Sequence, residues 1–258
     1  MTGAPAANVL TVAGRRLEIV TIPMDPERTP IVMLHEGLGS VSAWRAFPLE
    51  LARRTQRSII VYSRYGHGAS EALAGPRDVR YMHDEAELVL PALLAALDIS
   101  APILFGHSDG ASIALIYAGR FPTGLRALVL EAPHVFVEPL TTASISRMKQ
   151  TLATSGLIDK LARHHAQPWT TFWGWNDIWL DPAFAGWNIT EYLPAIAVPT
   201  LLIQGRDDEY GTVAQAEAIA RAVPHTQTLL FEHSGHSPHR VHEDAVLART
   251  ASFLSGLE

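Results

Sequence analysis

The chain has 258 residues, 48% of them hydrophobic and 18% charged, and a formal net charge of -6. This length fits one large domain or a core domain with an insertion, and it allows a sizeable buried core. The 20 basic and 26 acidic residues are mixed without a basic stripe, so we expect no nucleic-acid partner. The absence of cysteine excludes disulfides, thiolate metal sites and a cysteine nucleophile, so any nucleophile must be an oxygen.

No stretch of the sequence resembles a targeting or membrane segment. Residues 1–7 lack the basic and apolar regions of a secretory signal, and no run of about eighteen apolar residues occurs. We therefore expect a cytoplasmic protein without a membrane partner.

The first part of the chain alternates short apolar runs with segments of helical spacing. Ala13-Gly14 predicts the turn of a hairpin. Continuous apolar runs of four or so residues are typical of strands buried on both faces, and 3.6-residue spacing indicates helices. On these grounds we expect strands at 9–12, 15–22, 31–34, 59–62 and 103–105, and helices at 43–54 and 84–97.

The most informative stretch is Gly106-His107-Ser108-Asp109-Gly110, which separates the strand at 103–105 from a small-residue helical segment. This pattern predicts a nucleophile elbow, a sharp strand-to-helix turn with a serine at its apex. Such a turn needs residues without bulky side chains on both sides, and the two glycines meet this need. The N–H of Asp109 would then point to the place where an oxyanion forms, at the positive end of the helix dipole.

The second part of the chain returns to strands after a long helical segment. Residues 134–194 contain two helical stretches, at 143–152 and 158–165, and a segment dense in aromatic residues: Trp169, Phe172, Trp173, Trp175, Trp179, Phe184, Trp187 and Tyr192. Strands are expected at 125–130, 198–203 and 227–231, with helices at 212–222 and 243–254. Alternating strands and helices predict a mostly parallel eight-stranded sheet with helices on both faces. We assign 1–133 and 195–258 to this α/β core domain and 134–194 to an inserted α-helical cap.

Two further motifs follow late strands: Gly205-Arg206-Asp207-Asp208 and Ser234-Gly235-His236-Ser237. With the elbow, their order resembles the α/β-hydrolase fold family, whose triad runs serine, acid, histidine. The resemblance implies that Ser108 is the nucleophile, His236 the base and Asp208 the acid. It also implies oxyanion N–H groups from Asp109 and from Gly37, with Leu38 as the second choice. Tyr65-Gly66-His67-Gly68-Ala69-Ser70 resembles a structural turn of the family.

The chemistry of a serine nucleophile independently requires such a set. A serine hydroxyl is almost fully protonated at neutral pH, so it needs an adjacent imidazole. A carboxylate must hold the tautomer of that imidazole, and two donors must stabilise the oxyanion. Asp207 and Glu131 compete with Asp208 as the acid. His233, His236, His239 and His242 invite a metal interpretation, but a loop through Pro238 would not keep them on one face, so we predict no metal and no cofactor.

Two acidic residues depart from the commoner family pattern: Glu36, where glycine is usual, and Asp109, where an uncharged residue is usual. Asp109 suits the first turn of a helix, and Glu36 could cap its turn or pair with Arg64. Alternatively, the two carboxylates border the pocket and select substrates. We expect Glu36, Leu38, Trp173 and Trp179 to line an apolar or aromatic substrate pocket.

The resemblance implies a serine hydrolase that cleaves an ester, lactone or thioester of a small apolar or aromatic substrate. It also allows carbon–carbon hydrolysis of ring-cleavage products and cofactor-free dioxygenase chemistry. A non-catalytic binder of small ligands is a further alternative, disfavoured because binding alone has no use for a strained serine. The expected partner is a small molecule, and a homodimer is compatible with the sequence.

Overall fold

The computed structural model describes residues 7–257, so the prediction for the first residues lies almost wholly outside the described chain. One sheet of eight strands runs through the molecule: β1 Asn8–Val12, β2 Arg15–Ile22, β3 Ile31–Leu34, β4 Ile59–Tyr62, β5 Ile103–His107, β6 Ala127–Glu131, β7 Thr200–Gly205 and β8 Thr226–Phe231. The strand order is β1-β2-β4-β3-β5-β6-β7-β8. The β1/β2 and β2/β4 pairs are antiparallel and the other pairs are parallel, which confirms the predicted mostly parallel sheet.

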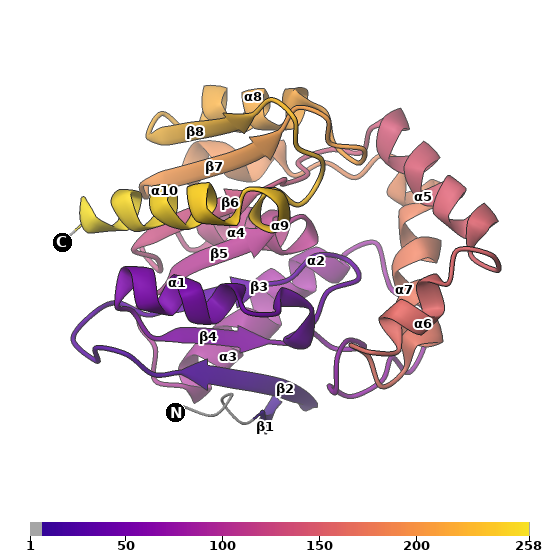
Figure 1. The fold of residues 1–258 in the computed structure, drawn as a ribbon, viewed down its shortest axis with the longest axis horizontal. Coiled ribbons are helices and arrows are strands. Elements are labelled where there is room, and N and C mark those ends of the chain that lie inside the picture. Colours follow the sequence, from indigo (N-terminus) through magenta and orange to yellow (C-terminus); the bar gives the residue numbers. More distant parts are fainter. Residues whose placement is uncertain (1–6, 258) are drawn as a thin grey trace.

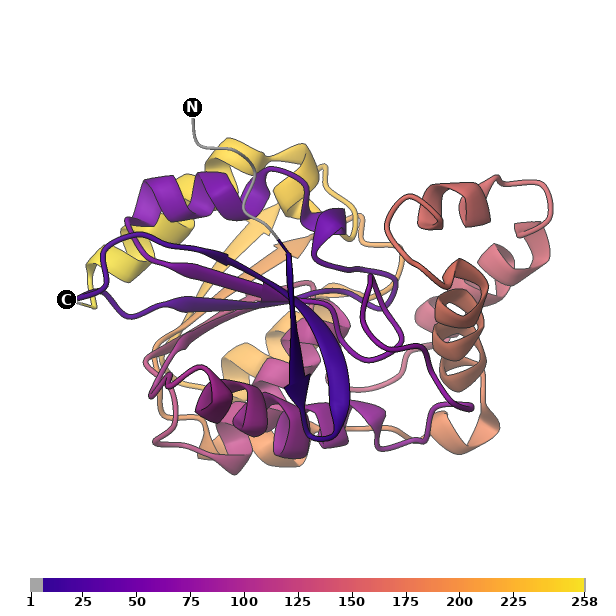
Figure 2. The ribbon, with the colours of Figure 1, turned by 90° about the horizontal axis from the view of Figure 1, so that it is seen from below.

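Helices cover both faces of the sheet (Figures 1 and 2). Helices α1 (Phe47–Thr55) and α10 (Glu243–Ser255) lie together on one face. The opposite face carries α3 (Leu90–Ala96), α4 (Asp109–Arg120) and α8 (Val213–Ala222). The predicted helix at 84–97 is three segments in sequence, α2 (Tyr81–Asp84), a wider turn over Glu85–Val89, and α3.

Three helices lie between β6 and β7, beyond the ends of the strands: α5 Pro139–Thr151, α6 Leu157–Leu161 and α7 Pro168–Trp179 (Figures 1 and 2). They are followed by the short 3-10 turns Pro182–Phe184 and Thr190–Ala195, and α9 (Pro238–Val241) comes late in the chain. The sequence predicts helical stretches near α5 and α6 but leaves α7 unassigned, because polar residues interrupt the apolar ones in its segment and blur the helical spacing. The division into a core and a cap at residues 134 and 194 stays a prediction.

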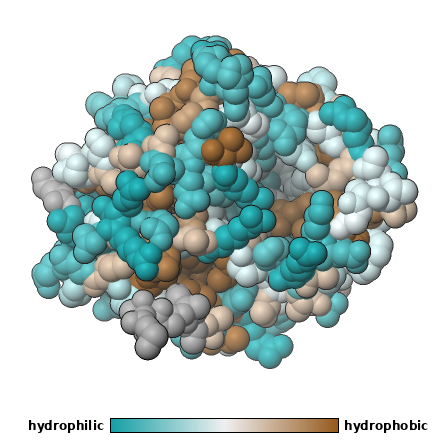
Figure 3. All heavy atoms as spheres, in the orientation of Figure 1, coloured by the Kyte–Doolittle hydropathy of each residue, from teal (hydrophilic) through white to brown (hydrophobic). Residues whose placement is uncertain are grey.

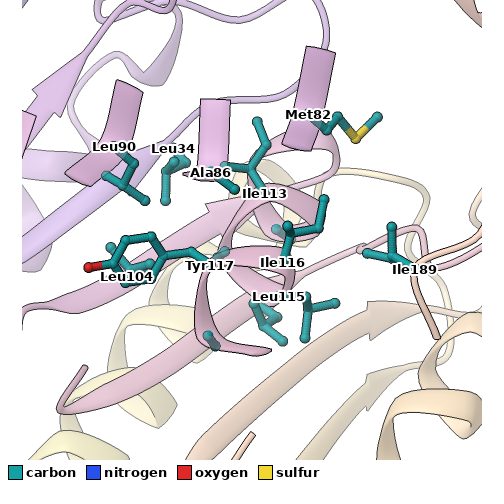
Figure 4. Packing of buried hydrophobic residues seen from close by; sticks show 14 of the residues in the cluster. Leu34, Met82, Ala86, Leu90, Leu104, Ile113, Leu115, Ile116, Tyr117 and Ile189 are labelled. Atoms are coloured by element: carbon teal, nitrogen blue, oxygen red, sulfur yellow. The ribbon is translucent and has the colours of Figure 1, made fainter. Parts of the chain in front are cut away.

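Two apolar clusters form the core, one on each face of the sheet. The larger cluster surrounds α4, which is buried along most of its length (Figure 4). Ile113, Leu115 and Ile116 of this helix contact side chains from strands, helices and the segment before β7. Burial of apolar side chains stabilises the fold by roughly 25 cal/mol per Å² removed from water. The helix that begins beside Ser108 is therefore held rigidly against the sheet.

The outer surface seen in Figure 3 is mostly hydrophilic, with small separate hydrophobic patches. Among the described residues, no helix combines the length and apolarity that a membrane span requires.

Candidate active site

Ser108 lies at the sharp turn between β5 and α4. Its φ of 54° is positive, a conformation that costs a non-glycine residue about 1–3 kcal/mol and that clusters at functional sites. Its N–H donates to the backbone oxygen of Glu131 at 2.8 Å, which ties the turn to the end of β6. A Cβ at Gly110 would lie 2.1 Å from the backbone oxygen of Leu34. Only glycine therefore allows α4 to begin this close to β3.

His236 connects Ser108 to Asp208. Its Nε2 is 2.8 Å from the Oγ of Ser108, and its Nδ1 is 2.9 Å from both carboxylate oxygens of Asp208. Asp208 follows β7 and also accepts the N–H groups of Tyr210 at 2.8 Å and Gly211 at 3.1 Å. The structure thus brings together the three residues that the sequence selects as a triad.

The environment of Asp208 keeps its carboxyl group ionised. Burial raises its pKa, but the charge of His236, the hydrogen bond from that ring and the N–H of Tyr210 outweigh burial and lower the pKa to about 2. The side chain of Asp208 is only 1% exposed. An ionised acceptor at Nδ1 fixes the proton there, so Nε2 is left as the acceptor for the serine proton.

The two alternative acids lie elsewhere. Asp207 has a 67% exposed side chain, and its carboxylate is 3.9 Å from the ring of His233. Glu131 is fully buried and accepts both the backbone N–H of His239 at 2.9 Å and its Nδ1–H at 2.8 Å. Within the described part of the chain, neither carboxylate forms a hydrogen bond or an ion pair with His236.

Gly37 and Leu38 form the turn that follows β3. The turn is fixed by the ring of His67, whose Nε2 is 2.9 Å from the backbone oxygen of Gly37, and by Arg64, which donates to the backbone oxygen of Glu36 at 2.9 Å. The N–H groups of Gly37 and Leu38 have no hydrogen-bond acceptor within the part of the chain described here. They are therefore free to bind an oxyanion together with the N–H of Asp109, the first residue of α4.

The glycine at position 37 is required by its neighbour on α7. A Cβ there would lie 2.1 Å from the indole Nε1 of Trp175. The indole therefore packs directly against the turn that carries the candidate oxyanion donors.

The carboxylates of Glu36 and Asp109 are both paired. Glu36 contacts Arg240 at 3.1 Å and the Nδ1 of His107 at 3.6 Å, whereas Asp109 accepts the hydroxyl of Tyr81 at 2.8 Å. The guanidinium of Arg64 lies 3.7 Å from Asp109. The suggested pairing of the Glu36 carboxylate with Arg64 is thus wrong, because Arg64 is buried against Asp109 and reaches only the backbone of Glu36.

A cavity of about 210 Å³ opens beside Ser108. Its lining residues come from the turns after the strands, from the start of α4, and from α5, α7 and α9: Glu36, Gly37, Leu38, Ser108, Asp109, His134, Thr141, Ile145, Met148, Trp175, Trp179, Tyr210, His236 and Arg240. Glu36, Leu38 and Trp179, which the sequence analysis assigned to a substrate pocket, are among these lining residues. Trp173 does not, and lines a separate cavity with Leu73 and Arg77.

Helical geometry explains this difference. Trp175 and Trp179 are four residues apart on α7 and therefore share one face, whereas Trp173 lies two residues before Trp175, on another face. Two features of the sequence could have indicated α7 and this pair: the proline at its first position, Pro168, and the four-residue spacing of Trp175 and Trp179. His134 and Tyr210 were also missed, although each follows the carboxyl end of a parallel strand, where sites of α/β sheets gather.

The histidine-rich tract separates into different environments. His239 is paired with Glu131, and the ring of His242 stacks on Phe231. His107, Glu131 and His239 offer atoms within 4.8 Å of one another, but the Nε2 of His107 is 2.7 Å from the backbone oxygen of His236. These side chains therefore hold the segment around His236 by hydrogen bonds.

The sequence matches the alpha/beta hydrolase fold family over residues 29–188. It is 25% identical to a proline iminopeptidase of Levilactobacillus brevis over 268 residues, which cover 88% of each chain. It is 28% identical to a putative carbamate hydrolase of Pseudomonas syringae over 229 residues, which cover 81% of this chain and 87% of that one.

The fold is also similar to the solved structure of an alpha/beta hydrolase enzyme from a Medee basin deep-sea metagenome library. The TM-score is 0.79 at 18% identity, with 96% of this chain and 97% of that chain covered. The family model matches well over half of the chain, and the chain has the fold expected for that family. The chain belongs to the α/β hydrolase fold family.

Proposed function

We propose that this protein is a serine hydrolase that cleaves an ester-like bond of a small apolar or aromatic substrate. The observation that carries the proposal is the hydrogen-bonded chain from Asp208 through His236 to Ser108, with 2.9 Å and 2.8 Å contacts at the two ring nitrogens. Such a chain activates a hydroxyl at neutral pH and serves no purpose in a protein that only binds.

The proposed reaction proceeds through an acyl-enzyme. The Oγ of Ser108 attacks the carbonyl carbon while its proton passes to the Nε2 of His236. The carbonyl oxygen becomes an oxyanion bound by the N–H groups of Gly37 and Asp109. His236 then donates the proton to the leaving group. It later accepts a proton from the water that attacks the acyl group, and returns this proton to the Oγ of Ser108 as the acid leaves.

The lining of the cavity favours an apolar or aromatic acyl group in the substrate. Ile145 and Met148 of α5 and Trp175 and Trp179 of α7 line the cavity together with Ser108. Apolar walls around a few polar groups suit a small organic compound. We accordingly propose that residues 134–194 act as the cap of this site.

The relatives described above include a proline iminopeptidase and a putative carbamate hydrolase. A peptide amino terminus is cationic at neutral pH and would need an unpaired carboxylate nearby. Glu36 and Asp109, the acidic residues that line the cavity, lie beside Arg240 and Arg64 respectively. This pairing favours a substrate without a cationic group.

Labelling with a fluorophosphonate probe tests the proposal, because the probe reacts only with an activated serine. We expect the wild-type protein to be labelled and to hydrolyse p-nitrophenyl acetate, and the Ser108→Ala protein to lose both properties. Ser255→Ala is the control, since this serine is exposed on α10 and its hydroxyl donates only to the backbone oxygen of Ser252, at 2.9 Å. Labelling that persists in Ser108→Ala would contradict the proposal.

A panel of substrates then separates the reaction types. Esters, lactones, thioesters and ring-cleavage diketones are offered at equal concentration to the wild-type protein. We expect the ester-like compounds to be turned over with a higher kcat/KM than the diketones. The reverse order would favour carbon–carbon hydrolysis on the same site.

A further inference from the structure

His134 lies beside the candidate triad without forming part of it. It follows β6 at the same edge of the sheet as Ser108, and its backbone is fixed by α4. The hydroxyl of Ser112 donates to the backbone oxygen of His134 at 2.6 Å and accepts its N–H at 3.1 Å. Because Ser112 is on the helix that begins beside Ser108, the position of His134 is fixed relative to the nucleophile.

The ring of His134 is enclosed on one edge. A Cβ at Gly211 would lie 3.2 Å from its Cε1 and 3.4 Å from its Nδ1, and this Nδ1 is buried without a hydrogen-bond partner among the described residues. The ring centroid is 5.2 Å from Trp179 and 5.6 Å from His236. Since His134 lines the cavity, the edge that carries Nε2 is the one left to face it.

The environment also determines the protonation of this ring. Burial, followed by the charge of His236, lowers the pKa of His134 to about 4, so the ring is neutral near pH 7. A buried N–H without an acceptor is rarer in proteins than an acceptor without a donor. We therefore assign the single ring proton to Nε2, on the edge that faces the cavity, and the lone pair to Nδ1.

We propose that His134 is a specificity-determining residue, whose Nε2–H donates to an oxygen atom of the bound acyl group beyond the scissile carbonyl. The inference rests on the proposed function and narrows its substrate class. The substrates are apolar or aromatic acyl compounds that carry an ether, hydroxyl or carbonyl oxygen within reach of this ring. Ile145, Met148 and Trp179 provide the apolar surroundings in which one such hydrogen bond discriminates strongly.

The first test compares p-nitrophenyl hexanoate with three analogues in which an ether oxygen replaces carbon 3, 4 or 5. For each analogue, kcat/KM is divided by that for hexanoate, in the wild-type protein and in His134→Phe. The intrinsic effect of the oxygen on ester reactivity is the same for both proteins and cancels. We expect the ratio for at least one analogue to fall about tenfold in His134→Phe, the loss expected for one hydrogen bond.

Two further variants distinguish a donor from a change of shape. His134→Gln keeps an N–H donor and should retain part of the oxygen preference. Tyr210→Phe removes a hydroxyl from the same cavity and should leave the preference at the wild-type value. An oxygen preference that is lost in Tyr210→Phe and kept in His134→Phe would overturn the inference.

A binding measurement keeps the inference separate from the hydrolytic proposal. In the Ser108→Ala background, the dissociation constants of the same four esters are measured by quenching of tryptophan fluorescence, with and without His134→Phe. We expect the same roughly tenfold loss of the oxygen preference. If no ester is hydrolysed but this loss is seen, the proposed function fails and the His134 contact stands. If all oxygen ratios are unchanged by His134→Phe in both assays, the contact is wrong.

Discussion

At the level of single residues, the triad acid is the assignment that mutation can decide most directly. Replacing Asp208 with Asn removes the charge that orients Nδ1–H of His236 and allows the wrong tautomer, in which Nε2 carries the proton and cannot accept another. We expect kcat for p-nitrophenyl acetate to fall by about 10⁴-fold with little change in KM. Steady-state kinetics at pH 7.5 measure this effect.

Asp207→Asn is the matched control, because this neighbour is exposed and does not contact His236. We expect it to retain nearly full activity. An active Asp208→Asn together with an inactive Glu131→Gln would transfer the role of the acid to Glu131.

Much of the candidate triad could be predicted from sequence because strict local chemistry surrounds it. Gly110 is required by a backbone oxygen 2.1 Å from where its Cβ would be, so the elbow has a recognisable pattern. By contrast, no local sequence pattern indicates which residue a long charged side chain will pair with. The Glu36 carboxylate contacts Arg240, which is 204 positions away, and only the folded chain determines that Arg64 contacts Asp109 instead.

At the level of elements, the segment that carries His236 depends on buried hydrogen bonds from two strands. His107 at the end of β5 contacts the backbone oxygen of His236 at 2.7 Å, and Glu131 at the end of β6 binds His239 at the start of α9. Burial raises the pKa of Glu131, but the charge and hydrogen bonds of His239 outweigh it, so the net pKa is lowered.

Glu131→Ala should therefore loosen this segment. The change leaves two donors of His239 without an acceptor in a buried environment, which costs about 3–5 kcal/mol of folding free energy. A misplacement of His236 by about 1 Å would lower kcat by roughly 10²-fold. Urea unfolding and steady-state kinetics measure the two effects.

Glu232→Ala is the control for a surface carboxylate. Its side chain is 70% exposed and pairs with Arg206, so its loss should change stability by at most about 1 kcal/mol. If Glu131→Ala matched this control in both assays, the buried pair would not hold the segment.

The helices between β6 and β7 were harder to predict than the strands. The strands of a parallel sheet are buried on both faces, which gives short continuous apolar runs such as Ile31–Leu34. The buried face of helix α7 includes the polar Thr171 and Asn176, whereas the apolar Trp169 is exposed, so its apolar residues do not form one clear stripe. The sequence therefore predicted an aromatic pocket but selected Trp173 instead of Trp175.

At the level of the whole molecule, several buried histidines are neutral when the chain is folded. The Nδ1–H of His35 donates to the backbone oxygen of Glu36, while its Nε2 accepts the N–H of Arg64. His165 likewise accepts the N–H of Gly68 and donates to the backbone oxygen of Leu38. A ring that both donates and accepts has only one proton, and burial, the largest cause, lowers the pKa of both histidines.

Stability should therefore decrease as the pH falls below the ordinary histidine pKa of about 6.5. The unfolded chain binds protons at these histidines near that pH, whereas the folded chain binds them only at lower pH, so acid favours unfolding. Each such histidine contributes up to about 1.4 kcal/mol per pH unit. Glu85 has the opposite effect. Burial raises its pKa, so the folded chain binds a proton at this carboxyl group more readily than the unfolded chain does.

Urea unfolding at pH 8, 7, 6 and 5 measures the slope of the free energy of unfolding against pH. The variant His134→Gln tests whether buried histidines cause this slope. Because the pKa of His134 is lowered to about 4, its loss should reduce the slope between pH 6 and pH 5 by up to about 1.4 kcal/mol per unit, whatever it does to the absolute stability. His233→Gln replaces a side chain that is 96% exposed and should leave the slope unchanged. If the free energy of unfolding depended on pH equally in the wild-type protein and both variants, His134 would titrate alike in the folded and unfolded chains. That result would contradict the lowered pKa of His134 that we attribute to its burial.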